Sequence, residues 1–117
     1  MLFSIIPGLR AARRIGAAER KEKEGDRLGV MNVCSEALQI LGRKQVDLER
    51  PWCRSAASQA LWGYCRAANA LDRKVELVEM LTRWRPTHLA WMKSPITAQE
   101  AEYLKWFEQV LHHREMS

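Results

Sequence analysis

The sequence predicts an all-α protein of four to five helices, and three observations support this fold class. Runs of β-branched residues, period-2 alternation, and Asn-Gly or Asp-Gly hairpin turns are missing from the 117 residues. Strong helix formers such as Ala, Leu, Glu, Arg and Lys are abundant instead. Hydrophobic residues make up 47% and charged residues 28%, which suits a folded domain. We expect a basic and charged arm or helix at residues 1–25 and a single all-α domain at residues 26–117.

The first 18 residues combine large apolar side chains with three arginines, Arg10, Arg13 and Arg14, and contain no acid. This composition is typical of a mitochondrial targeting segment or of a basic amphipathic helix that lies on a surface. A plain N-terminal arm is the alternative. The apolar run at residues 2–6 is far shorter than the ~20 residues that span a bilayer. We therefore predict that the three arginines contact a partner or a membrane surface.

Two further helical stretches are expected before residue 43. Residues 19–27 place opposite charges four positions apart, which predicts a solvated helix that ends at Gly25. From Asp26 onward an amphipathic helix follows, and Gly42 ends it as a C′ residue. Its expected buried face consists of Val30, Val33, Cys34, Ala37, Leu38 and Leu41.

A helical hairpin is expected at about residues 51–69 and 72–85. Pro51 suits the first turn of the first helix, because a proline there loses no hydrogen bond. Small residues dominate the stripe that should let a neighbouring helix approach closely: Ala57, Ala60, Leu61, Tyr64, Cys65 and Ala68.

The second helix of this hairpin is expected to begin at an Asp72 cap, after a turn at residues 69–70. Its buried face should contain Val75, Val78 and Leu81, widened by Leu77, Met80 and Trp84. Pro86 is expected to end it, because the residue before a proline is driven away from helical angles.

Residues 55–86 resemble a pentatricopeptide-type helical hairpin. The matching residues are Tyr64, Cys65, Arg66, Ala67, Leu71, Asp72, Glu76, Leu77, Val78, Glu79, Met80 and Pro86. The same region is similar to the helical, matrix-side subunit Va of cytochrome c oxidase through Ala60, Leu61, Cys65, Arg66, Asn69, Val75 and Glu79. The first resemblance implies a packed hairpin, and the second implies a subunit of a respiratory complex. Repeat proteins read RNA with several stacked units, and the sequence shows no second copy at a fixed period, so a scaffolding role is favoured.

The last helix begins at a capping box, Thr97-Ala98-Gln99-Glu100, with a hydrophobic staple between Ile96 and Ala101. Leu104, Phe107 and Leu111 join Ala101 on one side of this helix, and Tyr103, Trp106 and Val110 lie on another. One side can face the core, and the second is a candidate partner surface. We predict a partner interface formed by Trp91, Tyr103, Trp106 and Val110. A central position of this helix in the core is the alternative.

The chemistry-bearing residues form no catalytic or metal-binding pattern. The three cysteines lack a CxxC motif, and we expect reduced, buried thiols. His88, His112 and His113 lie outside any recognisable nucleophile or zinc motif. No glycine-rich phosphate-binding motif occurs in the sequence. We therefore expect no enzyme activity, no bound metal and no cofactor.

Two functions remain open. Five tryptophans in a small chain are typical of a protein interface, and they favour a non-catalytic accessory or scaffolding subunit of a larger assembly. Its expected setting is a mitochondrial inner-membrane respiratory complex, at the matrix side or the membrane periphery. Its partners would be other protein subunits, with residues 1–18 touching the membrane surface. A cytoplasmic location is expected if residues 1–18 are not a targeting signal.

The alternative is an RNA-associated basic protein, such as a component of an organellar ribosome. The net charge of +5 and the pI near 9.4 are consistent with it. Outside residues 10–14, however, the basic residues are mixed with acids. A nucleic acid is therefore the less favoured partner.

Overall fold

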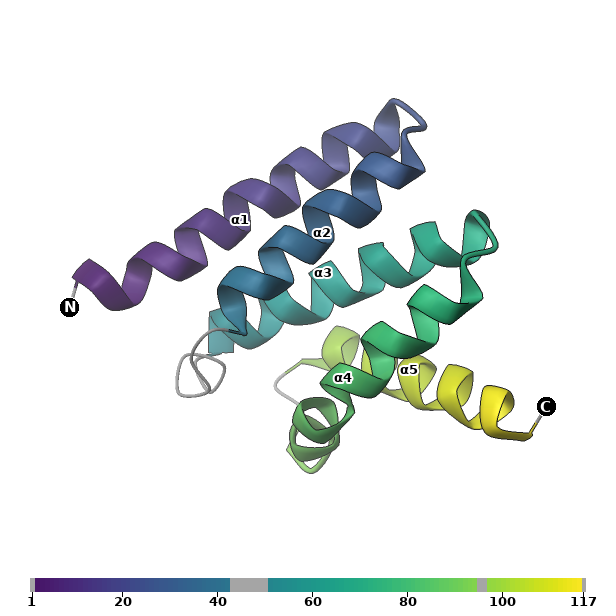
Figure 1. Ribbon diagram of the computed structural model, residues 1–117. Helices are drawn as coiled ribbons and strands as arrows, with labels where there is room; N and C mark the ends of the chain where they lie inside the picture. Colours follow the sequence, from purple (N-terminus) through teal and green to yellow (C-terminus); the bar gives the residue numbers. More distant parts are fainter. Residues whose placement is uncertain (1, 43–50, 95–96, 117) are drawn as a thin grey trace. The chain divides into compact units, whose positions relative to one another are not determined.

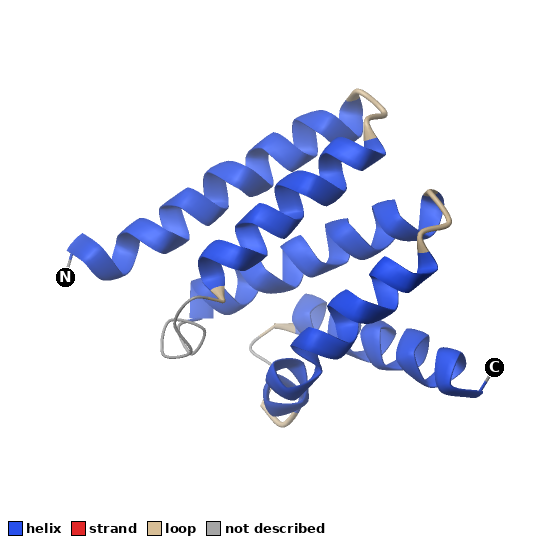
Figure 2. Ribbon diagram, viewed as in Figure 1, coloured by secondary structure: helices blue, strands red, loops and turns tan. Residues whose placement is uncertain are grey.

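A computed structural model describes residues 2–42, 51–94 and 97–116 (Figure 1). These stretches are helical apart from short turns, and no strand occurs in any of them (Figure 2). The helices are α1 (Leu2–Lys23), α2 (Arg27–Leu41), α3 (Pro51–Ala70), α4 (Lys74–Met92) and α5 (Ala98–Met116). The predicted all-α class with four to five helices is therefore confirmed.

The helices group into two compact units. Met1–Asp72 contains α1, α2 and α3, and Arg73–Ser117 contains α4 and α5. In the first unit α2 packs against α1 and α3, and α1 also contacts α3; in the second unit α4 packs against α5. The sequence-based boundary at residue 25 falls inside the first unit, in the turn between α1 and α2.

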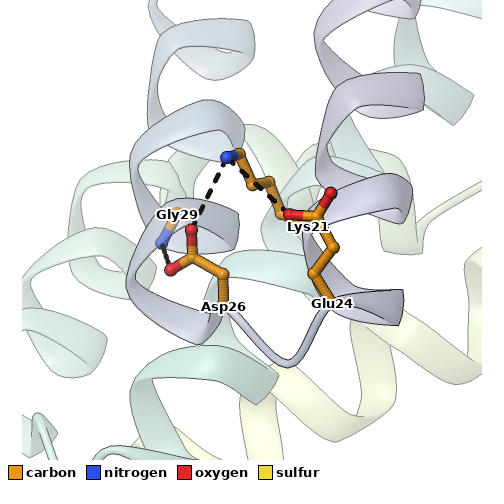
Figure 3. Close-up of polar contacts among 4 residues, drawn as sticks. All are labelled: Lys21, Glu24, Asp26 and Gly29. Atoms are coloured by element: carbon orange, nitrogen blue, oxygen red, sulfur yellow. Dashed lines mark hydrogen bonds and ion pairs between the residues drawn. The ribbon is translucent and has the colours of Figure 1, made fainter.

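Two residues fix the turn between α1 and α2. Gly25 has φ 77°, a left-handed conformation that glycine adopts without steric cost, and the predicted end of the charged helix at this glycine is confirmed. Asp26 caps α2, because its Oδ1 accepts a hydrogen bond of 2.9 Å from the backbone N–H of Gly29 (Figure 3). Lys21 Nζ lies 3.7 Å from Asp26 Oδ2 and 3.9 Å from Glu24 Oε2 (Figure 3). The charged turn therefore also holds the start of α2 in place.

Small residues bring α3 close to α2. A Cβ atom added at Gly63 of α3 would lie 3.0 Å from the Cys34 Sγ of α2, so a larger residue at this position must displace that thiol. On α2 the predicted face is buried except for Val33, which is half-buried. The predicted α3 stripe is buried throughout, at Ala57, Ala60, Leu61, Tyr64, Cys65 and Ala68.

Pro86 does not end α4, contrary to the prediction. The helix continues through this proline to Met92. An interior proline removes a backbone hydrogen bond and costs about 3 kcal/mol. Beyond it, however, His88 and Trp91 are both buried and extend the inner side of α4, and the burial of these two side chains offsets the loss. Residues 87–92, expected to form a short turn, belong to the same helix.

The predicted cap and inner face of α4 also need correction. Asp72 has φ 57° and lies in the left-handed turn after α3, and the N-cap position is taken by Arg73. Val75 is 72% exposed rather than buried, because the side of α4 that packs inward contains Leu77, Leu81 and Trp84 instead. Both predicted hairpin helices exist, as α3 and α4, but they belong to different units. Their packing against each other stays a prediction.

Gly42 and Thr97 lie at two other predicted helix ends, the end of α2 and the start of α5. Gly42 caps α2 with its N–H on the Leu38 carbonyl, but its φ of −81° is right-handed and needs no glycine. Thr97 Oγ1 accepts a hydrogen bond of 3.0 Å from the Glu100 backbone N–H, which confirms that half of the capping box. The predicted staple involves Ile96, which lies outside the described residues.

We predict that Gly63→Val destabilises the first unit by about 1–3 kcal/mol, because the added carbons crowd Cys34 in a packed seam. Gly16→Val is the matched control: Gly16 is also helical, and the nearest atom to an added Cβ is the flexible end of Arg20 at 4.0 Å. Urea denaturation followed by circular dichroism gives both free energies of unfolding. Equal stabilities of the two variants would show that the seam is not tightly packed.

Candidate docking surface

A polar cluster joins the two helices of the second unit. His88 of α4 is fully buried, and its Nε2 lies 3.4 Å from Oε1 of Glu108 on α5. The Nη2 of Arg85, one turn earlier on α4, lies 3.4 Å from the other carboxylate oxygen of Glu108. The His88 ring also stacks on Phe107 of α5, with ring centroids 5.8 Å apart. Glu108 and Phe107 therefore fix the rotation of α4 on α5 through neighbouring positions.

His88 is held in its neutral form. Burial lowers the pKa of His88 below its ordinary value of 6.5; Glu108 acts in the opposite direction, and Arg85 lowers the pKa further. Neither ring nitrogen of His88 has a hydrogen-bond partner among the described residues. Because the ring is inaccessible to solvent, it cannot contact a substrate in this structure. We assign the cluster a structural role in fixing α4.

With that rotation fixed, α4 turns an apolar side away from its core. We define the α4 outer stripe as Val75, Val78, Thr82, Pro86 and Leu89. At about 100° per residue, these positions fall within about 80° of one another around the helix. Val75 is 72% and Leu89 41% exposed, Thr82 and Pro86 are exposed, and Val78 is half-buried. Four apolar residues aligned on one side of a helix, interrupted by Thr82, are typical of a protein-interaction surface.

The four residues predicted to form an interface differ in burial: the three on α5 are partly accessible, whereas Trp91 is buried. Tyr103, Trp106 and Val110 are half-buried and share one side of α5. Trp106 packs edge-on against Phe107, with ring centroids 5.7 Å apart. Trp91 is only 6% exposed and lies 6.4 Å from Trp84, so it belongs to the inner side of α4. Little of the Trp91 surface is therefore left for a partner.

The predicted basic residues lie on α1. The Nε of Arg14 is 3.2 Å from Oε2 of Glu36 on α2, and both side chains are about half exposed. Arg13 is exposed and has no ion-pair partner within the described part of the chain. Arg10 belongs to helix α1, but its side chain is not among those that the structure describes. An exposed ion pair such as Arg14–Glu36 contributes about 0–1 kcal/mol, so Arg14 remains open to another anion.

The cysteines are poorly placed for nucleophilic chemistry. Cys34, Cys53 and Cys65 are buried, and none forms a disulfide. The pKa of the Cys34 thiol is raised to about 12. Burial is the larger cause, and the negative charge of the Glu22 carboxylate is the second. The pKa of the Cys65 thiol is raised as well, mainly by burial and secondly by the neighbouring Cys34. Both residues are therefore neutral thiols at physiological pH, and a neutral thiol is a weak nucleophile.

The described residues, 2–42, 51–94 and 97–116, contain neither a metal-binding cluster nor a membrane-spanning helix. No group of three or more His, Cys, Asp or Glu side chains in these ranges could hold a metal ion. None of the helices within them is both long and apolar enough to span a bilayer.

Comparison with known proteins adds no relative. No family model matches the chain, and no curated protein or solved structure matches it either. The resemblance to a pentatricopeptide-type hairpin and to the oxidase subunit therefore stays a prediction.

The α4 outer stripe was missed in the sequence. Val75 and Val78 were assigned to the core, and Pro86 and Leu89 were placed at or beyond the end of the helix. A signal was present, because apolar residues occur on two opposite sides of the segment from residue 74 to residue 92. Periodicity alone does not say which of two apolar sides is buried.

We predict that the free energy of unfolding falls as the pH drops below about 6.5. The unfolded chain then binds a proton at His88, whereas the folded chain, whose His88 pKa is lower, does not. One such proton contributes at most about 1.4 kcal/mol per pH unit.

His88→Phe should remove this part of the pH dependence while keeping a ring against Phe107. His112→Gln, which replaces an exposed histidine of α5, is the matched control. Urea denaturation at a series of pH values between about 5 and 7 measures the slopes. Parallel curves for wild type and His88→Phe would contradict the buried neutral histidine.

Proposed function

We propose that this protein is a non-catalytic helical accessory subunit that docks to a neighbouring protein through the α4 outer stripe. The observation that carries the proposal is the alignment of Val75 and Leu89 on one side of α4, both exposed, with Val78 and Pro86 between them. Single exposed apolar residues are common on protein surfaces. A line of them along four turns of one helix has a clear use only when another apolar surface covers it.

The second unit gives this surface a rigid base. His88 holds the opposite side of α4 against Glu108 and Phe107 of α5, and the Arg85–Glu108 pair restrains rotation about the helix axis. A helix whose orientation is fixed before binding loses less conformational entropy when a partner docks. A second contact region for the partner is proposed on α5. It consists of the half-buried side chains Tyr103, Trp106 and Val110.

A respiratory complex of the mitochondrial inner membrane is the setting that we propose for this subunit, at the matrix side or the membrane periphery. Residues 1–18, which carry arginines and no acid, support it. The resemblance of residues 55–86 to the oxidase subunit points the same way. The buried thiols and the inaccessible His88 are consistent with a role that needs no reacting group.

We predict that Leu89→Glu abolishes co-migration of the protein with its assembly on a native gel after gentle detergent extraction. A charge on the outer stripe would remain desolvated and unpaired in the interface, which should weaken docking at least about tenfold. Leu28→Glu is the matched control, because Leu28 of α2 is 44% exposed, close to the 41% of Leu89. Circular dichroism checks that both variants keep their helix content.

Two results would contradict this proposal. Equal behaviour of Leu89→Glu and Leu28→Glu would remove the outer stripe as the docking surface. Release of the wild-type protein by nuclease, with binding that weakens steeply as salt rises, would favour the alternative of an RNA-associated protein.

A further inference from the structure

Helix α1 is longer than the helix on which it packs. It has 22 residues, whereas α2 has 15. The two helices run antiparallel from the turn at Gly25, so the excess of about seven residues lies at the N-terminal end of α1 (Figure 1). At 1.5 Å per residue, α1 extends beyond the end of α2 by about 10 Å. We call residues 2–9 the α1 overhang.

The composition of the α1 overhang differs from that of the adjoining turns. Residues 2–9 contain no charged residue and five large apolar ones: Leu2, Phe3, Ile5, Ile6 and Leu9. The next five residues contain Arg10, Arg13 and Arg14, and the first acid of the chain is Glu19. An uncharged apolar segment is therefore followed directly by a cluster of positive charge.

The helical register places apolar positions on the outer side of α1. Ala18 is buried and marks the side of α1 that packs inward. At about 100° per residue, the position of Leu9 lies about 180° from that of Ala18 around the helix. The positions of Leu2 and Ile5 lie about 160° and 140° from it on the same count. Three of the five apolar positions of the overhang therefore fall on the side of the helix opposite Ala18.

We propose that residues 2–14 bind the surface of an anionic lipid bilayer, with the α1 overhang inserted and the three arginines at the level of the lipid phosphates. The composition agrees with an interfacial helix, which lies in the plane of the bilayer surface and buries its apolar face about 5–10 Å into the boundary between headgroups and acyl chains. The charge agrees as well, because Arg13 is exposed and the Arg14 side chain stays about half exposed beside Glu36. Basic residues next to an apolar anchor strengthen binding to anionic lipids.

Lipid is favoured over RNA as the anionic partner. A nucleic-acid backbone would attract the arginines but would gain nothing from the apolar overhang. A bilayer surface uses both features at once. The proposal depends on α1 alone, goes beyond the docking function of α4, and can fail or succeed without it.

Vesicle flotation with the purified full chain tests the proposal. The probes are vesicles of phosphatidylcholine and phosphatidylglycerol mixed at about 7:3, and vesicles of phosphatidylcholine alone. We expect binding to the mixed vesicles and at least about tenfold weaker binding to the neutral ones. The double variant Arg10→Gln with Arg13→Gln should bind about 25-fold more weakly, from a factor of about five per arginine. Its charge-matched control is Lys23→Gln with Arg27→Gln, which should bind as wild type does.

A second double variant tests whether the apolar residues of the α1 overhang contribute to binding. Ile5→Asn with Ile6→Asn should weaken binding to the mixed vesicles at least about tenfold at unchanged net charge. Leu28→Asn, which removes an exposed leucine elsewhere in the first unit, is the control. Circular dichroism verifies the helix content of each variant. The preference for the mixed vesicles over the neutral ones is measured with wild-type protein, so it does not depend on the folding of any variant.

Three outcomes would overturn the proposal. The first is no binding of wild-type protein to the mixed vesicles. The second is wild-type binding by Ile5→Asn with Ile6→Asn, which would reduce the contact to adsorption by charge. The third is tighter binding of a single-stranded oligouridine than of vesicles, lost in the arginine variant and kept in the isoleucine variant, which would assign the surface to RNA.

Discussion

The first unit depends on the close approach of α2 and α3. Most of the α3 residues in this seam are small, and Gly63 leaves room for the Cys34 thiol at a distance where a Cβ atom would already be crowded. Small residues bury little apolar area each, so the seam gains its stability from close contact along its whole length. Helix α1 then packs on this pair, with Arg14–Glu36 and Arg66–Glu22 at its edges.

The second unit depends on a different constraint, the burial of a histidine between two helices. Keeping His88 neutral and stacked on Phe107 costs stability at low pH, and it also fixes the side of α4 that faces α5. Once that side is fixed, Val75 and Leu89 must point away from it. The interior contact therefore determines the surface that we propose as the docking site.

The elements recovered from the sequence were those set by short-range interactions. The faces of α2 and α3, the end at Gly25 and the cap at Thr97 each depend on residues within a few positions of one another. The errors gather at α4, where Asp72, Val75 and Pro86 were all misassigned. That helix is apolar on two opposite sides, so its periodicity has two solutions. The outer stripe was missed for the same reason, although every residue in it was visible.

The sequence by itself determined the all-α class, most helix bounds and the small-residue seam, because propensity, capping and apolar spacing act locally. The tertiary structure decided which side of α4 is buried and whether the helix survives Pro86. Burial of His88 and Trp91 offsets a cost of about 3 kcal/mol that no local signal could outweigh. It also decided the extent of the α1 overhang, because the part of α1 that extends past α2 depends on where α2 ends.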